Sequence, residues 1–257
     1  MADSGYNKEI QRDPWWLVKQ YTTARIAMGN VGVSIPSNAM LQFRLDHAHA
    51  RDAVYSTLYK ESIGDALSQM GINSLTVQSS AKTRQEYIQR PDLGRKLAEA
   101  SRQSLSKLTS EKSQLTIMVA DGLSAIAAND HFIPLMNNLL PALRTASISL
   151  SPIVLIEQGR VAISDEIAFT LKSELALILI GERPGLSSPN SLGAYLTYGP
   201  KPGLTDESRN CVSNIRPEGL NYSEASRKIF YLISQALARK LSGVSLKDNT
   251  AGDFLKS

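Results

Sequence analysis

Short apolar runs alternate with amphipathic segments along the second half of the chain. Strands buried on both faces of a sheet are expected where these runs are longest, at 115–120, 153–156 and 175–180. Apolar residues recur with helical spacing over three further segments, at 123–145, 164–172 and 222–241. Strands that alternate with helices predict an α/β fold with a mostly parallel sheet and helices on both of its faces.

Weaker patterns complete this second half. Shorter strands are expected at 194–198 and 211–215. Pro134 and Pro141 are expected to interrupt the helical pattern of 123–145, because proline lacks the N–H group that a helix interior uses.

The first part of the chain has a mainly helical pattern. Helices are expected at 14–28, 34–55, 61–70 and 91–108, and one strand at 74–78. Trp15 and Trp16 are expected to act as packing anchors. We therefore expect two parts, a mainly helical N-terminal part at 1–110 and an α/β domain at 111–257.

The composition narrows the class of protein. Hydrophobic residues make up 42% of the 257 residues and charged residues 20%, as in a globular protein with a sizeable core. The net charge of +4 is spread along the chain, which argues against nucleic acid as a partner. A single cysteine indicates a reducing compartment, and no apolar run reaches the roughly 18 residues of a membrane span. With no secretory signal pattern at the N-terminus, we expect a cytoplasmic protein.

Four loops lie at or beyond the ends of the expected strands, at 121–124, 157–161, 181–188 and 209–214. The carboxyl ends of parallel strands share one edge, where open α/β sheets bind their ligands. The loop at 181–188 is the most informative, because it follows a fully apolar run and places Glu182 beside Arg183. Two interpretations stay open, a ligand site at this edge and ordinary turns for which glycine is suited.

The sequence lacks the motifs of several enzyme classes. The turn with Ser124 has Ile126 where the hydrolase nucleophile elbow needs glycine, so Ser124 is expected to begin a helix. Neither Gly-x-Gly-x-x-Gly nor Gly-x-x-x-x-Gly-Lys-Ser/Thr occurs, so nicotinamide, flavin and P-loop chemistry lack a phosphate cradle. His47 and His49 are two residues apart and would lie on different faces of a helix, so no metal site is expected.

Two residues of the edge loops have alternative interpretations. Cys211 is either a small buried hydrophobe or a side chain against a ligand. Glu182 either contacts a ligand or forms an ion pair with Arg183 that stiffens the loop.

Over residues 22–243 the sequence resembles one family, the small (light) subunit of ethanolamine ammonia-lyase, an adenosylcobalamin enzyme. The resemblance depends on seven strings in the same order, at 23–29, 47–54, 90–97, 120–124, 158–161, 181–188 and 210–215. It implies a Rossmann-like domain preceded by a small helical N-terminal part.

The resemblance also implies the site and its partners. The cofactor would be adenosylcobalamin, and the cobalamin-contacting positions match Val161, Glu182 and Cys211. A large TIM-barrel subunit would bind ethanolamine and carry the radical steps, so no catalytic residue is assigned to this chain. The complex would be a hetero-oligomer that converts ethanolamine to acetaldehyde and ammonia.

Some implications stay open. No cobalt ligand is expected, because Asp46 and His47 are adjacent and the Asp-x-His-x-x-Gly motif of base-off cobalamin proteins is missing. Asn30 stands where similar proteins tend to carry arginine, so a phosphate or partner contact there stays open. Only residues 1–21 precede the match, which leaves location inside a bacterial microcompartment open. The alternatives are a stand-alone cobalamin-binding module without catalysis and a free Rossmann-type enzyme.

Overall fold

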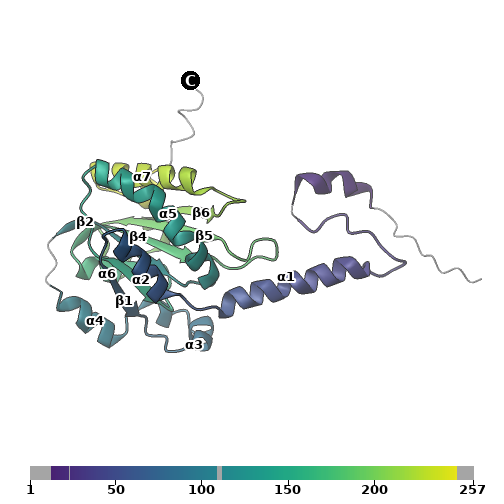
Figure 1. The fold of residues 1–257 in the computed structure, drawn as a ribbon, viewed down its shortest axis with the longest axis horizontal. Coiled ribbons are helices and arrows are strands. Elements are labelled where there is room, and N and C mark those ends of the chain that lie inside the picture. Colours follow the sequence, from purple (N-terminus) through teal and green to yellow (C-terminus); the bar gives the residue numbers. More distant parts are fainter. Residues whose placement is uncertain (1–12, 23, 109–111, 248–257) are drawn as a thin grey trace, which may run out of the picture.

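The computed structural model describes residues 13–22, 24–108 and 112–247, and it is organised around one six-stranded sheet with the order β1-β3-β2-β4-β5-β6. The strands are β1 (Ser74–Gln78), β2 (Ser113–Ala120), β3 (Ile153–Glu157), β4 (Ser173–Gly181), β5 (Leu192–Tyr198) and β6 (Arg209–Ile215). The first four strands run parallel, whereas β5 is antiparallel to both β4 and β6. The predicted mostly parallel sheet is therefore confirmed (Figure 1).

Helices connect and flank these strands. The α-helices are α1 (Ser37–Tyr55), α2 (Lys60–Gln69), α3 (Arg84–Gln89), α4 (Glu99–Ser106), α5 (Ala125–Thr145), α6 (Ile163–Thr170) and α7 (Tyr222–Arg239). Short 3-10 helices are η1 (Pro14–Tyr21), η2 (Leu93–Arg95), η3 (Asp206–Ser208) and η4 (Gly243–Ser245). Within the described residues, no helix combines the length and apolar character needed to cross a membrane.

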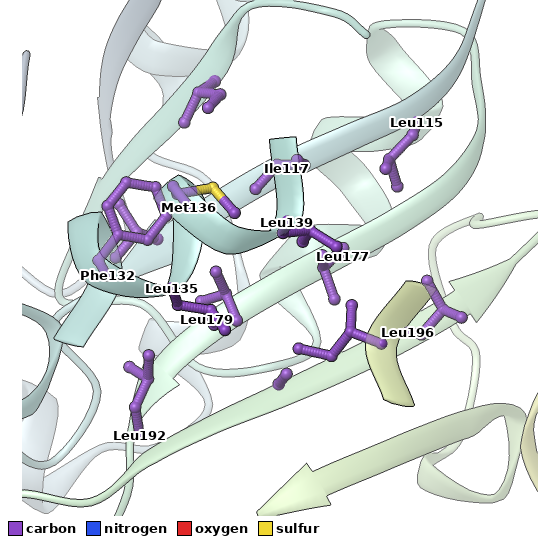
Figure 2. Packing of buried hydrophobic residues seen from close by; sticks show 14 of the residues in the cluster. Leu115, Ile117, Phe132, Leu135, Met136, Leu139, Leu177, Leu179, Leu192 and Leu196 are labelled. Carbon is purple, nitrogen blue, oxygen red and sulfur yellow. The ribbon is translucent and has the colours of Figure 1, made fainter. Parts of the chain in front are cut away.

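The sheet is covered on both faces because its central strands carry apolar side chains on both faces. On β4, Leu177 and Leu179 contribute to one core cluster, while Ile178 and Ile180 contribute to the other, as the period of two requires. Helices α5 and α7 cover the first face, where Phe132 and other residues of α5 lie over β2 and β4 (Figure 2). Helix α6 packs on the second face. The expectation of helices on both faces is confirmed.

The single helix expected at 91–108 is wrong. Its first part forms only the short η2, and residues 96–98 then run beside the end of β1. The N–H of Ala98 donates to the Gln78 carbonyl at 3.0 Å, and the N–H of Ser80 donates to the Lys96 carbonyl at 2.8 Å. This pairing holds the segment extended, so α4 begins only at Glu99. The six-residue α3, capped by the Thr83 side chain, was not expected.

Two further helical expectations are also wrong. Helix α5 continues through Pro134 and Pro141, because its nine buried apolar residues hold it against the core despite the missing N–H groups. The helix expected at 14–28 is limited to η1.

Helix α1 projects from the body that contains the sheet and leads to η1 (Figure 1). Its only buried residue is Ala53. Trp15 and Trp16 on η1 have exposed fractions of 66% and 51%, so they are not the packing anchors that we expected. The end of α1 is tied to the body through Val54, whose carbonyl accepts a hydrogen bond from Arg84 Nε at 2.5 Å.

Candidate functional site

The carboxyl ends of the parallel strands meet at one edge of the sheet. Strand β2 lies between β3 and β4, so the chain leaves β2 toward one side and later returns to its other side. Such a reversal of strand order opens a crevice at the carboxyl ends, which is the usual ligand position in open α/β sheets. Strand β6 runs in the same direction as β4 because two antiparallel pairs separate them, so its end also reaches this edge.

The loops after β2 and β4 are in close contact at the crevice. Gly122 has a φ of +57°, and a Cβ atom there would lie 2.2 Å from the Gly181 carbonyl oxygen. A Cβ atom at Gly181 would lie 1.9 Å from the Ser124 carbonyl oxygen. Both positions therefore require glycine, so the turn interpretation holds at this point of the edge.

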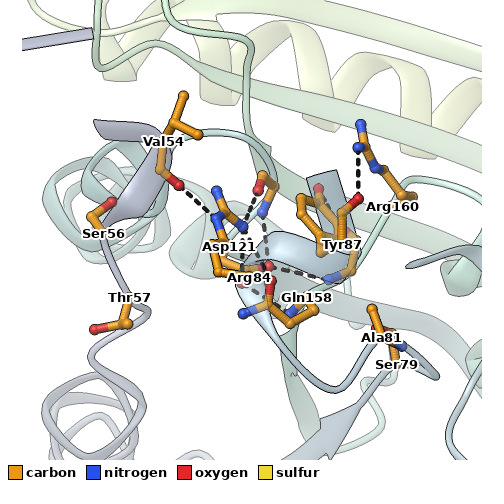
Figure 3. A network of polar contacts seen from close by, with 12 residues as sticks. Val54, Ser56, Thr57, Ser79, Ala81, Arg84, Tyr87, Asp121, Gln158 and Arg160 are labelled. Atoms are coloured by element: carbon orange, nitrogen blue, oxygen red, sulfur yellow. Dashed lines mark hydrogen bonds and ion pairs between the residues drawn. The ribbon is translucent and has the colours of Figure 1, made fainter. Parts of the chain in front are cut away.

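A buried aspartate joins the loops after β2 and β3 (Figure 3). Asp121 Oδ1 accepts from the N–H groups of Gly122 at 2.9 Å and Gly159 at 3.1 Å, and Oδ2 accepts from that of Gln158 at 2.9 Å. Arg84 Nη1 lies 3.5 Å from Oδ2. Desolvation raises the pKa of Asp121 to about 6, although Arg84 and the three N–H groups oppose the shift. Asp121 thus holds the edge loops in place.

Two arginines stack on a buried tyrosine beside this aspartate (Figure 3). The guanidinium carbons of Arg84 and Arg160 lie 4.8 and 4.3 Å from the centre of the Tyr87 ring, within the range of cation–π attraction. The Tyr87 hydroxyl donates to the Gly159 carbonyl at 3.0 Å. A Cβ atom at Gly94 would lie 2.8 Å from Arg160 Cγ, so glycine there leaves room for the stack. The side chain of Arg160 is thereby held at the edge.

Two adjoining pockets lie along this edge, with volumes of about 710 and 410 Å³. Both are lined by Arg160, Val161 and Tyr195. Cys211 lines the larger pocket and Glu182 the smaller one. The structure therefore brings the three residues singled out from the sequence to one depression, which we call the edge groove.

Glu182 is bound to β6 and to the residue that precedes β5, and not to its neighbour Arg183. Its carboxylate accepts hydrogen bonds from the hydroxyls of Ser191 and Ser213 and from the N–H of Asn214, the last at 3.2 Å. No ion pair joins Glu182 to Arg183 within the described part of the chain, so that interpretation is wrong. A carboxylate offers about four acceptor sites, which leaves capacity for a donor from a ligand.

Cys211 is exposed on β6, so it is not the buried hydrophobe that one interpretation described. It is paired across the strands with Tyr195, and the two side chains share a hydrogen bond. Desolvation raises the pKa of the Cys211 thiol and nearby Glu182 adds to the shift, while the bond to Tyr195 opposes it. The thiol is therefore protonated at neutral pH, which suits a contact role and not a nucleophilic one.

A buried ion pair forms the wall of the larger pocket. Arg209 Nη2 lies 2.7 Å from Asp165 Oδ2, and each side chain has an exposed fraction of 2%. Arg209 Nη1 also donates to the Thr205 carbonyl at 3.3 Å, so the pair ties α6 to the loop before β6. Desolvation raises the pKa of Asp165 to about 6 against the opposing effect of Arg209. Three buried atoms around this pocket have no hydrogen-bond partner, namely Arg160 Nε, Asp165 Oδ1 and Arg209 Nε.

Other side chains considered from the sequence have structural roles. Ser124 precedes α5, accepts from the N–H of Ala127 at 3.4 Å and donates to the Pro189 carbonyl at 2.9 Å, so the helix-start prediction is confirmed. Among the residues that the structure describes, no three His, Cys, Asp or Glu side chains form a group able to hold a metal ion.

The sequence reasoning missed Asp121, Arg84 and Tyr87, which build the edge, and Tyr195, which lines both pockets. For Asp121 a signal existed, because an acid directly follows a fully buried strand. The other three have no local signal, since their contacts join segments far apart in the sequence.

The sequence matches known proteins over most of its length. The family profile of the ethanolamine ammonia-lyase light chain (EutC) matches residues 12–247. An ethanolamine ammonia-lyase small subunit of Pseudomonas fluorescens (strain SBW25) is 46% identical over 260 residues, covering 100% of this chain and 94% of the relative. The small subunit of Pseudomonas paraeruginosa (strain DSM 24068 / PA7) is 50% identical over 251 residues, covering 96% and 92%. That of Azotobacter vinelandii (strain DJ / ATCC BAA-1303) is 48% identical over 239 residues, covering 92% and 88%.

The profile covers more than nine tenths of the chain, and the relatives are similar from end to end. The chain therefore belongs to the ethanolamine ammonia-lyase light chain family.

Proposed function

We propose that this chain is the small subunit of an adenosylcobalamin-dependent ethanolamine ammonia-lyase and that its edge groove forms one wall of the cofactor site. The observation that carries the proposal is the meeting of Val161, Glu182 and Cys211 along two pockets that share part of their lining. Val161 lies in the β3–α6 loop, Glu182 directly follows β4, and Cys211 is on β6.

The chemistry of the groove fits the edge of a corrin ring. Such a ring has an apolar rim that carries primary amides, which both donate and accept hydrogen bonds. Val161 and Ile180 offer apolar contact, while Glu182 retains acceptor capacity. Two buried atoms without a hydrogen-bond partner also suit such amides, because Asp165 Oδ1 is an acceptor and Arg209 Nε is a donor. Adenosylcobalamin supplies a cobalt–carbon bond whose homolysis begins radical chemistry.

The groove is one half of a site, so we propose that the large subunit closes it. Cys211 is exposed, and a site for radical chemistry needs water excluded from it. The large subunit, a TIM barrel, would bind ethanolamine and carry the reaction to acetaldehyde and ammonia. Side chains of this chain would bind and orient the cofactor, with no catalytic residue among them. The strand order around β2 supports a Rossmann-like fold, to which the N-terminal helices are added.

Reconstitution tests this proposal. The purified chain is combined with adenosylcobalamin and ethanolamine, with and without the large chain, and acetaldehyde is measured. We expect acetaldehyde only when both chains are present. Turnover by this chain alone would favour a free enzyme, and tight cobalamin binding without any effect of the partner would favour a stand-alone module.

A further inference from the structure

The β3–α6 loop, residues 159–162, lies where the two pockets meet. Arg160 and Val161 line both pockets, and Ala162 lines the larger one. Helix α6 begins directly after this loop, so its N-terminal end adjoins the larger pocket.

Two backbone N–H groups at the start of α6 have no acceptor within the described residues. The carbonyls of Arg160, Val161 and Ala162 accept the first bonds of the helix. The N–H groups of Val161 and Ala162 donate no hydrogen bond within the described residues. Open N–H groups and the positive end of the helix dipole together favour an anion at such a position.

The acids near this end are engaged in ion pairs. Asp165 pairs with Arg209, and Glu166 pairs with Arg102 at 2.6 Å. Asp206 also pairs with Arg209, at 3.7 Å, but its side chain is 94% exposed. Its charge therefore faces solvent, where it is strongly screened.

Arg160 adds a second, independent donor at the same place. Its only side-chain hydrogen bond within the described residues is from Nη2 to the Tyr87 carbonyl at 3.3 Å, and its buried Nε has no partner. Arg95 and Lys96 also line the larger pocket, and neither forms an ion pair with a described residue. The mouth of the larger pocket therefore carries uncompensated positive charge.

We propose that Arg160 and the N-terminal end of α6 bind a phosphodiester group of the ligand. Cobalamin carries one such group, in the loop that joins its corrin ring to its nucleotide base, so the inference rests on the proposed function and adds an anion subsite to it. The guanidinium offers a planar pair of donors to phosphate oxygens, and Tyr87 holds it ready for that contact. Arg95 and Lys96 would strengthen the attraction without fixing its geometry.

The test compares two ligands that differ in this group. Adenosylcobalamin and adenosylcobinamide, which lacks the phosphodiester and the base, are titrated into the complex with the large chain, and binding is followed by visible absorbance. For Arg160→Gln we expect affinity for cobalamin to fall by a factor of about 10 to 100, as for a lost charge-assisted contact. Affinity for cobinamide should stay within about twofold of the wild type, because that ligand has no anion to lose.

Three further variants keep the test sharp. Arg160→Lys retains the charge but not the planar pair of donors, so an intermediate loss of affinity is expected for cobalamin alone. The double variant Arg95→Gln with Lys96→Gln changes only exposed side chains, and about a fivefold loss for cobalamin alone is expected. Arg239→Gln, on the exposed end of α7, serves as the matched control and should bind both ligands as the wild type does.

The outcomes separate the two proposals. Equal losses for cobalamin and cobinamide in Arg160→Gln would overturn the phosphodiester subsite and leave the proposed function standing. A wild-type complex that binds neither ligand would instead contradict the proposed function.

Discussion

At the scale of single residues, Glu182 joins the groove to the antiparallel end of the sheet. Its carboxylate accepts hydrogen bonds from Ser191, Ser213 and Asn214, which holds the loop after β4 against β6. Gly193 makes this possible, because a Cβ atom there would lie 2.9 Å from Glu182 Oε1. The side chain is thus fixed by its neighbours before any ligand arrives, which lowers the entropic cost of binding.

Glu182→Gln is expected to weaken cobalamin binding by the assembled complex about tenfold, or about 1.4 kcal/mol. The amide has one acceptor atom in place of two, so it cannot serve its three present donors and a ligand as well. Glu174→Gln is the matched control, since Glu174 is exposed near the start of β4, at the opposite end from Glu182. Equal dissociation constants for both variants and the wild type, measured by visible absorbance, would rule out a contact from Glu182.

At the scale of elements, the edge depends on loops that are joined by buried polar groups. Asp121 connects the loops after β2 and β3, and Arg84 extends the connection to the Val54 carbonyl at the end of α1. The loops that line the groove are therefore parts of one hydrogen-bonded unit, which explains how they can present a fixed wall.

This unit predicts a pH dependence of stability. The pKa of Asp121 is raised to about 6, above its ordinary value of 3.8, so the folded state binds more protons than the unfolded state between these values. Its contribution to the free energy of unfolding is therefore largest below about pH 4 and falls as pH rises toward 6. The pKa of Asp165 is also raised to about 6, so its contribution to the free energy of unfolding falls over the same pH range.

Asp121→Asn should flatten this fall, as measured by urea unfolding from pH 4 to pH 7. At pH 7 the variant should also lose about 1–3 kcal/mol, because the amide leaves buried N–H groups without an acceptor. Asp65→Asn, at an exposed position on α2, should change neither quantity. An unchanged slope in Asp121→Asn would show that this carboxyl is not the titrating group.

At the scale of the whole molecule, the body around the sheet buries its apolar side chains, whereas the projecting helix α1 leaves many of its own exposed. Both faces of the sheet are covered, whereas α1 exposes a series of large apolar side chains and buries only Ala53. Because the end of α1 is tied to Arg84 beside the groove, a subunit that closes the groove would also lie next to this helix. Large exposed apolar surfaces commonly mark such interfaces.

The double variant Leu41→Glu with Leu45→Glu tests this arrangement. These side chains have exposed fractions of 64% and 48%, so the melting temperature of the isolated chain should change little. Assembly with the large chain, measured by size-exclusion chromatography with light scattering, should weaken at least tenfold because two charges would be buried without partners. Gln69→Glu, at an exposed position on α2, is the control. Normal assembly of the double variant would exclude this face of α1 from the interface.

Much of the fold follows from the sequence because the patterns that encode it are local. The apolar runs of β2, β3 and β4 and the amphipathic pattern of α7 determined the strands, the parallel core and the helical layers. The strings around Glu182 and Cys211 determined the family. Only the tertiary structure decided the reversed direction of β5 between β4 and β6, the extended segment at 96–98 and the continuity of α5 through its prolines.

The site divides in the same way. The positions of Val161, Glu182 and Cys211 could be named from the sequence, since each lies in or beside a recognisable strand-end loop. The stack of Arg160 on Tyr87 and the bonds of Asp121 to the β3–α6 loop could not, because they join residues separated by 37 to 73 positions. Local patterns determine which segments form helices and strands, but contacts over such separations exist only after the strands have paired. Pairing direction and loop contact depend on the packing of the whole core, which no single segment encodes.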